Sequence, residues 1–295
     1  MAMTGVSRHR EEDARTVEQR CLLQTKSQFL DWDPATCTEA VMVEPRALHY
    51  TAVALNSAVG ISGIDLITFA HGKNNAKFSQ ELVESNNKLE KAHNQGLLRL
   101  LPLPVGDLGG DAVVNKMPQI GLIEANSSYC ASWHHEYTRL LVNPGFWNLL
   151  RCDHTLIFQS DTVFCRGSSA KVKEFTSFPY IGGETPRLSN NGHIHMNGGF
   201  SLRSRAAMLK CIDEMQYEIQ KTDMGEDEIY SGCPTLKQPP RELVDRFAID
   251  NAQKLPRIAP LGVHKPWGDG FYKDQVTKMC DGAQTLTDAF NAEPG

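Results

Sequence analysis

The stretch His154-Thr-Leu-Ile-Phe158, followed directly by Gln159-Ser-Asp161-Thr-Val-Phe-Cys165, best indicates the fold of this chain. Its first part is a short run of apolar and β-branched residues, which is typical of a strand buried on both faces. A carboxylate, Asp161, follows shortly after the strand, and a second short apolar run begins at Val163. The stretch therefore predicts a buried strand that ends at a polar site.

The segments before this strand alternate between strands and helices. Strands are predicted at residues 40–43, 64–70 and 98–103, and helices at 47–58, 77–93 and 132–141, with a further helix beginning at Pro144. This alternation predicts an α/β domain with a mostly parallel, mixed central sheet flanked by helices. Because ligands bind such sheets at the carboxyl ends of the strands, we look for functional residues there. Loops at 104–110 and 182–192 are expected to shape the pocket.

The length of 295 residues favours one large catalytic domain, since single cores stop growing at roughly 250–300 residues. We predict an N-terminal helical extension over residues 1–36, where apolar residues recur at helical spacing. The catalytic domain is predicted over residues 37–275, and a C-terminal tail over 276–295.

The charge and hydropathy of the chain exclude some classes of function. A formal net charge of −5 gives no overall basic field, which argues against nucleic acid as a partner. No stretch approaches the ~20 consecutive apolar residues of a membrane span. The first residues lack the apolar core of a secretory signal, so we expect a cytoplasmic protein. A lumenal domain cut free of a membrane anchor would have the same composition.

The chain has eight cysteines at scattered positions, without a C-x-x-C pair. This spacing resembles neither a disulfide framework nor a zinc site. Cysteine packs well as a small apolar residue, so free buried thiols are the expectation.

Four groups of residues could carry chemistry, and the first is Asp161. A carboxylate at the carboxyl edge of the sheet can hold a divalent cation against a diphosphate. The usual motif of nucleotide-sugar sites has two aspartates spaced D-x-D, whereas Gln159 occupies the first position here. The same aspartate would also suit the start of an ordinary turn.

The second group is Asn197-Gly198-Gly199, which leads into an apolar strand and is preceded by His193 and His195. Adjacent glycines permit close approach of a ligand to the backbone, although a plain turn would also explain them. The two histidines are two positions apart and would share one face of a strand. They could form a metal pair, but histidines on the surface are the simpler expectation.

The third and fourth groups lie further along the chain. Glu226 and Asp227 form part of an acidic cluster before an apolar pair, where a helix dipole would stabilise them or one of them would serve as a general base. His264, Lys265 and Trp267 belong to the sequence H-K-P-W. Histidine can bind a cation, lysine can neutralise phosphate and tryptophan can cover a sugar. A surface turn is the alternative for this group.

Taken in order, these motifs resemble a little-characterised group of glycosyltransferase-like proteins, similar in plan to the GT-A superfamily of nucleotide-sugar transferases. The resemblance covers about residues 38–270. It also includes E-P-R at 44–46 and F-x-H-G at 69–72, and its most specific parts are N-G-G-F-S-L-R-S-R at 197–205 and H-K-P-W at 264–267.

The resemblance implies an activity and a cofactor. By position in the motifs, Asp161 and His264 would hold Mn²⁺ or Mg²⁺ on the diphosphate of a nucleotide-sugar donor, while Asp227, with Glu226 beside it, would be the base. The enzyme would transfer a sugar to a hydroxyl of a glycan or small-molecule acceptor, with inversion at the anomeric carbon. The residues expected to bind the donor are Glu44, Pro45, Arg46, Asn197, Gly198, Gly199, Lys265 and Trp267.

Other functions remain open at this point. A Rossmann-type oxidoreductase or methyltransferase would need a glycine-rich turn after the first strand, but that turn reads E-P-R-A. An aspartyl-phosphate phosphatase would need an aspartate where Gln159 stands. A catalytically degenerate carbohydrate-binding scaffold stays possible because Gln159 interrupts the D-x-D motif, and a retaining glycosyltransferase is a further alternative.

Overall fold

The computed structural model describes residues 33–72, 75–103, 137–188, 193–221, 224–268 and 271–293. Residues 33–295 belong to one compact unit. The predicted extension at 1–36 lies almost entirely outside the described residues, as does the predicted loop at 104–110. Those two assignments stay predictions.

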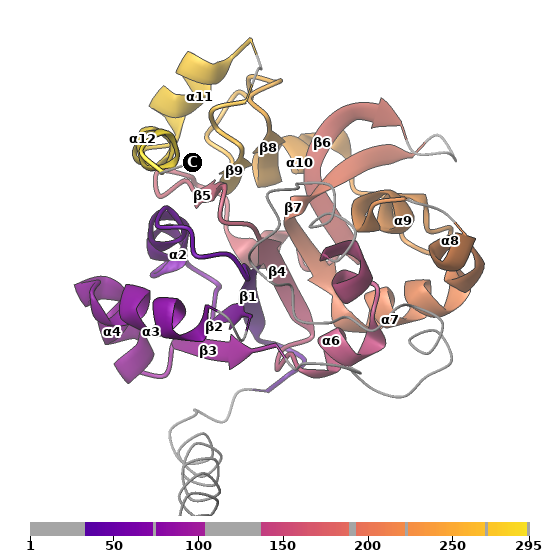
Figure 1. Cartoon of the computed structure of the whole chain (residues 1–295). Coiled ribbons are helices and arrows are strands. Elements are labelled where there is room, and N and C mark those ends of the chain that lie inside the picture. The colour runs from indigo at the N-terminus through magenta and orange to yellow at the C-terminus, as the bar shows by residue number, and fades with distance from the viewer. Residues whose placement is uncertain are drawn as a thin grey trace, which may run out of the picture. The chain divides into compact units, whose positions relative to one another are not determined.

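Nine strands of the described residues form one sheet, in the order β3-β2-β1-β4-β7-β6-β8-β9-β5 (Figure 1). The strands are β1 (Thr38–Val43), β2 (Leu66–His71), β3 (Leu98–Pro102), β4 (His154–Phe158), β5 (Thr162–Phe164), β6 (Tyr180–Leu188), β7 (Ile194–Ser204), β8 (Ala248–Asp250) and β9 (Gly262–His264).

The sheet is mixed and mostly parallel, which confirms the predicted fold class. Strands β3, β2, β1 and β4 run parallel, and β7 lies antiparallel between β4 and β6. Strands β6, β8 and β9 are again parallel, while β5 closes the other edge antiparallel to β9. Both β1 and β2 are buried along their whole length, as continuous apolar runs predict for parallel strands.

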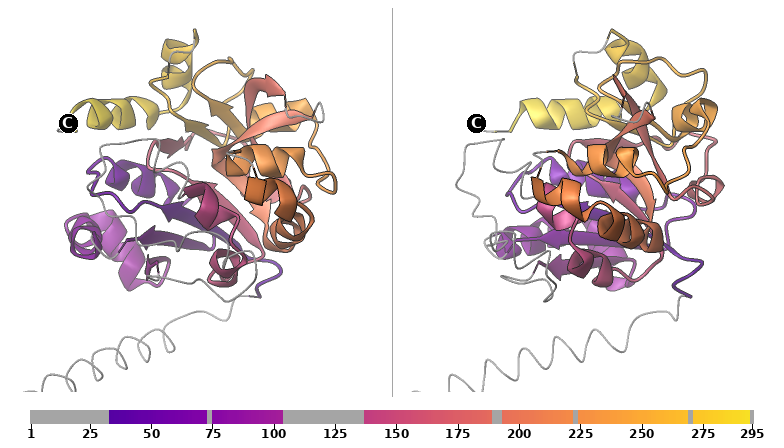
Figure 2. Two further views of the ribbon diagram at one scale, coloured as in Figure 1. Left: turned by 45° about the vertical axis from the view of Figure 1, so that its right-hand side comes forward. Right: turned by 90° about the vertical axis from the view of Figure 1, so that its right-hand side faces the viewer.

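Helices cover the sheet from both halves of the chain (Figures 1 and 2). The α-helices are α2 (Thr51–Ala58), α3 (Ala76–Glu84), α4 (Asn87–Asn94), α6 (Pro144–Asn148), α7 (Arg205–Glu214), α8 (Gln216–Lys221), α9 (Glu226–Gly232), α10 (Arg241–Phe247), α11 (Lys273–Met279) and α12 (Ala283–Asn291). Helices α3 and α4 contact β3, whereas α7 and α9 contact β7 and α10 contacts β6 and β8.

The predicted polar helix at 77–93 is two helices in the structure. Helix α3 ends at Glu84, and Asn86 caps α4 by accepting hydrogen bonds from the backbone N–H groups of Lys88 and Leu89 at 3.2 and 3.3 Å. An asparagine side chain that caps a new helix start competes with continuation of the preceding helix. The predicted loop at 182–192 is also different, because residues up to Leu188 belong to β6.

The expectation of free cysteine thiols is wrong. Disulfides join Cys37 to Cys152, Cys165 to Cys280 and Cys211 to Cys233, and Cys21 and Cys130 lie outside the described residues. Two of the three bonds span 115 residues. A pairing over that distance leaves no signature in the local spacing of cysteines, which is why the sequence did not indicate it.

Candidate active site

Asp161 and His264 meet at one edge of the sheet, as predicted. Nε2 of His264 lies 3.2 Å from Oδ1 of Asp161. Asp161 follows β4 in a turn that continues into β5, and His264 ends β9. Because β5 pairs with β9, Thr162 stands opposite His264. The backbone N–H of Lys265 also donates to the carbonyl oxygen of Asp161 at 2.8 Å. The short pair of strands therefore fixes the two side chains together.

Asp250, on β8, completes the surroundings of His264. It stands opposite His264 in the β8–β9 pairing, and its Oδ1 lies 2.7 Å from Nδ1 of His264. Burial alone lowers the pKa of His264, but the carboxylates of Asp161 and Asp250 outweigh burial and raise that pKa to about 9. Burial opposes ionisation of Asp161 too, yet the charges of His264 and Lys265 lower its pKa. Asp250 was not identified from the sequence, where it has no motif around it.

Gln159 and Gly199 lie against the same imidazole. Oε1 of Gln159 is 3.1 Å from Nε2 of His264, so the residue that interrupts the D-x-D motif does face the site. A Cβ added to Gly199 would lie 2.4 Å from Nε2 of His264 and 2.7 Å from Oε1 of Gln159. Only glycine, which has no Cβ, leaves room for these two side chains to approach the backbone so closely. This close approach explains why residue 199 is a glycine.

The glycine pair forms a tight turn inside β7. The Oδ1 of Asn197 accepts a hydrogen bond from the backbone N–H of Gly199 at 2.6 Å. The pairing of β6 with β7 shifts register here, because Gly182 pairs with Ser201 whereas Glu184 pairs with Met196. The extra β7 residues bulge from the sheet and bring the backbone close to the neighbouring side chains.

Gly198 faces the second acidic group. A Cβ added to Gly198 would lie 2.0 Å from Oε1 of Glu226. That oxygen accepts a hydrogen bond at 3.0 Å from Nη2 of Arg203, a fully buried side chain. The guanidinium of Arg203 also lies over the rings of Tyr180 and Tyr230, at 5.3 and 5.2 Å from their centroids. Burial and the charge of Asp227 raise the pKa of Glu226, and Arg203 opposes that rise.

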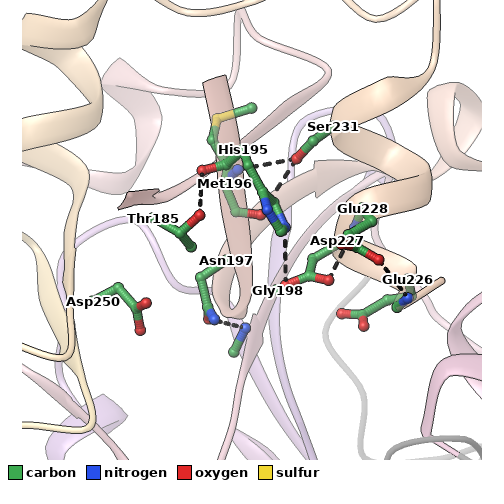
Figure 3. A network of polar contacts seen from close by, with 12 residues as sticks. Thr185, His195, Met196, Asn197, Gly198, Glu226, Asp227, Glu228, Ser231 and Asp250 are labelled. Atoms are coloured by element: carbon green, nitrogen blue, oxygen red, sulfur yellow. Dashed lines mark hydrogen bonds and ion pairs between the residues drawn. The ribbon is translucent and has the colours of Figure 1, made fainter. Parts of the chain in front are cut away.

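Asp227 has a different environment from Glu226. Its side chain is 22% exposed, against 8% for Glu226, so Asp227 is the acid that a ligand can reach. Its Oδ2 lies 3.5 Å from Nε2 of His195, and its Oδ1 accepts from the backbone N–H of Glu228 at 2.9 Å (Figure 3). Burial acts to raise the pKa of Asp227, but hydrogen bonding and charge from His195, together with Arg203, lower it.

His195 is therefore not a surface residue, contrary to the expectation from the sequence. It is 5% exposed and lies within β7, whereas His193 precedes the strand. The described residues contain no group of three or more His, Cys, Asp or Glu side chains able to hold a metal. The two residues predicted to bind a metal, Asp161 and His264, contact each other but do not belong to such a group of three.

Glu44 and Arg46 lie where β1 ends and form an ion pair. Nε and Nη2 of Arg46 donate to the two carboxylate oxygens of Glu44, each at 2.7 Å. The hydroxyl of Ser160, next to Asp161 in the chain, also donates to Glu44 at 2.7 Å. Pro45 packs near Gly72, whose added Cβ would lie 3.3 Å from Cβ of Pro45. The E-P-R turn is thus directly connected to the Asp161 turn.

Trp267 packs against the C-terminal helix. Its ring stacks on Phe290 of α12, with 4.0 Å between ring centroids, and its edge meets Tyr50. Lys265, two residues earlier, has a positive φ of 50°, a conformation that non-glycine residues seldom adopt. The backbone N–H of Lys265 donates to the carbonyl oxygen of Asp161, which holds this residue of the H-K-P-W segment beside Asp161.

Tyr137 is a buried residue that the sequence did not single out. Burial raises the pKa of its hydroxyl, and the charges of Glu226 and Asp161 add to that rise. Arg203 and a hydrogen bond with Gln159 act in the opposite direction. The charges of both acidic groups therefore act on the buried hydroxyl of Tyr137.

Comparisons with known proteins support the fold. Residues 119–264 match a family described as "Protein of unknown function (DUF5672)". A search of curated proteins found no match. Among solved structures, an active-site mutant of LgtC superimposes with a TM-score of 0.51 at 14% identity, covering 87% of this chain and 96% of that one. The glycosyltransferase GlyE of Streptococcus pneumoniae TIGR4, in its apo form, gives 0.48 at 12% identity, covering 87% of this chain and 64% of that one.

The α/β fold is thus GT-A-like, as the superposition on LgtC indicates. At this low identity the likeness to LgtC concerns the fold alone. In the described part of the chain, no helix has both the length and the apolar character needed to cross a membrane.

Proposed function

We propose that this protein is a metal-dependent glycosyltransferase that moves a sugar from a nucleotide diphosphate sugar to an acceptor hydroxyl, with inversion. The observation that carries the proposal is the meeting of Asp161 and His264 at the sheet edge of an LgtC-like fold. The two residues are 103 positions apart, and neither is needed to fill the apolar core. A carboxylate and an imidazole placed together suit a divalent cation.

The residues around the pair fit such a cation. Oδ1 of Asp161 is buried and has no hydrogen bond, only the ion pair with His264. Asp250 holds the other nitrogen of His264, as a second carboxylate commonly does behind a metal-binding histidine. Asp161 and His264 would hold Mn²⁺ or Mg²⁺, with the remaining positions left to phosphate oxygens and water. Bound there, the cation would neutralise charge on the diphosphate leaving group.

The chain supplies further groups for the donor. Lys265 lies near enough to lower the pKa of Asp161, so its ammonium can approach a phosphate at the same edge. Arg46 is held by Glu44. The segment Asn197, Gly198 and Gly199 would contribute by leaving room for the side chains of Glu226 and His264 beside the donor. Trp267 is stacked on Phe290, so it would contribute an edge of the donor site rather than a freely moving cover.

Asp227 is the proposed base. Its pKa is lowered, so it is ionised at neutral pH and can accept the proton of the acceptor hydroxyl. Glu226 is bound to the buried Arg203, so its part is to fix the start of α9, which carries Asp227. A base on one side of the sugar and a cation on the other suit an inverting displacement.

The compartment is part of the proposal. The cytoplasmic expectation came from the polar character of the first residues, and it did not anticipate that six cysteines form disulfides. Disulfides form and persist in oxidising compartments and are rare in the cytosol. We therefore favour the second alternative, a lumenal domain, for this enzyme.

The deciding experiment is an assay of the protein with a panel of nucleotide sugars, with released nucleoside diphosphate as the readout. Chelator-treated protein is titrated with Mn²⁺ or Mg²⁺ in the same assay. We expect turnover with one donor class that requires the added cation. Glycan binding without release of diphosphate from any donor would favour the degenerate scaffold, which Gln159 suggests. NMR of the product's anomeric proton distinguishes inversion from retention.

A further inference from the structure

We propose that His195 is a positioning residue for Asp227: the imidazole, buried behind the carboxylate, pairs with it and aims it at the acceptor hydroxyl. The inference rests on the proposed transferase function, because it assigns a partner to the proposed base. Nothing in the sequence motifs gives His195 this role.

The geometry places the two side chains one behind the other. His195 is 5% exposed on β7, and Nε2 lies 3.5 Å from Oδ2 of Asp227. The Asp227 side chain is 22% exposed, so one side of the carboxylate faces the imidazole while another side is open. Figure 3 shows the ring of His195 pointing at Asp227 across the gap between β7 and α9.

Hydrogen bonds hold both elements in place around this pair. The backbone N–H of Met196 donates to the hydroxyl of Ser231 on α9 at 3.0 Å. From the other side, the hydroxyl of Thr185 on β6 donates to the carbonyl oxygen of His195 at 3.3 Å. The second carboxylate oxygen of Asp227 is fixed by the N–H of Glu228. The carboxylate therefore has little freedom to rotate, which is what an oriented base requires.

Of the groups described near Asp227, His195 is the one to which we assign the positioning of its carboxylate. Arg203 pairs with Glu226, at 3.0 Å, rather than with Asp227. Glu226 is an acid and repels Asp227, and burial keeps the nearby Tyr180 phenol neutral by raising its pKa. Among the groups that lower the pKa of Asp227, His195 has the largest influence, ahead of Arg203.

The chemistry explains why a positioned carboxylate matters. In the transfer, the acceptor oxygen forms the new glycosidic bond and its O–H bond breaks, with the proton passing to Asp227. The diphosphate leaves with the electron pair of the old anomeric bond. Asp227 must be ionised before this step, and general-base catalysis contributes about 10²- to 10⁴-fold. A partner that holds the base ionised and oriented accounts for a part of that factor.

The first test does not depend on turnover. The carboxyl of Asp227 is followed by ¹³C NMR during a pH titration of protein labelled at aspartate, and its signal is assigned by its absence from Asp227→Asn. We expect the midpoint to rise by about one pH unit in His195→Leu. The matched control is His154→Leu, at the end of β4 that pairs with Ser204 rather than with the glycine segment of β7, which should leave the midpoint unchanged. An unchanged midpoint in His195→Leu overturns the inference.

The second test uses kinetics. We expect His195→Leu to lower kcat about tenfold and to move the acid limb of the pH profile upward, with the donor dissociation constant within about twofold of wild type. His195→Gln, which keeps an N–H donor, should restore part of kcat. The double variant with Asp227→Asn should be no slower than Asp227→Asn alone.

The outcomes separate the two proposals. Losses that multiply in the double variant would mean that His195 acts independently of Asp227 and would overturn the inference. A wild-type protein without turnover on any nucleotide sugar would count against the transferase function, while the NMR titration still decides whether His195 controls Asp227. Should His195→Leu fail to fold, the titration of His195→Gln decides, since loss of the imidazole should itself raise the midpoint.

Discussion

Two of the buried ion pairs close to β7, Asp161 with His264 and Glu226 with Arg203, differ in the balance of donors and acceptors. Around His264, three acceptor oxygens from Asp161, Gln159 and Asp250 crowd one imidazole. Around Arg203, the excess lies with the donors, because Nη1 of the guanidinium has no hydrogen bond and the rings of Tyr180 and Tyr230 cover it.

This difference distinguishes an ion pair suited to binding a ligand from an ion pair suited to stabilising the fold. A cation can bind where acceptor oxygens outnumber the donors around them and solvent has access. Solvent reaches this group of oxygens, because the Asp161 side chain is 18% exposed. A guanidinium closed in by aromatic rings and fully buried is out of reach of any ligand. The comparison therefore supports the proposal that the first pair binds a ligand and the second stabilises the fold, and variants at each pair test that proposal.

The largest effect is expected at the Arg203 pair. Glu226→Ala should lower the free energy of unfolding by about 3–5 kcal/mol, because it leaves the buried charge of Arg203 unpaired. Urea denaturation followed by circular dichroism measures the loss. The control is Asp153→Ala, which breaks the partly exposed pair with Arg205 and should cost about 1 kcal/mol or less. Equal losses in the two variants would refute the supporting role.

At the His264 pair the effect should be on activity. We expect Asp161→Asn to lower turnover about 100-fold and to weaken the dependence on Mn²⁺, with a change in unfolding free energy of about 1 kcal/mol or less. The control is Asp65→Asn, whose carboxylate accepts from the N–H of Thr38 at the opposite end of β1. Turnover of Asp161→Asn at the level of this control would remove the metal proposal.

The adjacent glycines allow a matched comparison of the two pairs. Gly198→Ala would push a methyl group onto Glu226, and Gly199→Ala would push one onto His264. Each should cost about 1–3 kcal/mol of stability through overpacking. Only Gly199→Ala should also weaken Mn²⁺ binding, measured by calorimetry on the folded variants. The same Mn²⁺ affinity in both variants would show that the glycine turn does not distinguish the pairs.

The smallest effect concerns Gln159. Gln159→Asp restores the two-carboxylate motif and should tighten Mn²⁺ binding by about tenfold, because affinity rises with the number of charged ligands. Gln159→Asn, which stays neutral, is the control. Weaker Mn²⁺ binding in Gln159→Asp than in this control would mean that the second carboxylate does not reach the cation.

Much of the fold could be predicted from the sequence. The runs that became β1, β2, β3 and β4 were recognisable because a buried parallel strand is continuously apolar, and the predicted 154–158 strand is β4 itself. The long β6–β7 hairpin was only partly predicted. Gly182 and Gly183 there are typical of a loop, yet they lie in the strand because neighbouring backbone comes close to both.

Residues of the candidate site could be predicted where several polar or charged side chains lie together in a short motif. Asp161, His264, Glu226 and Asp227 were all proposed from short segments of sequence. Asp250 and Arg203 were not, and His195 was considered only for a metal pair with His193, because each acts through a partner on another element. An isolated aspartate after a short strand or an arginine within one is ordinary, and nothing local separates it from a surface residue.

The sequence by itself determined the alternation of strands and helices and the chemical types of residues at the strand ends, because periodicity and residue type are local properties. Only the tertiary structure decided which residues meet: Asp161 with His264, Gly198 with Glu226, and cysteines as far as 115 positions apart. These contacts follow from the order of strands in the sheet and from packing in the core. Both depend on contacts between residues that are distant along the chain.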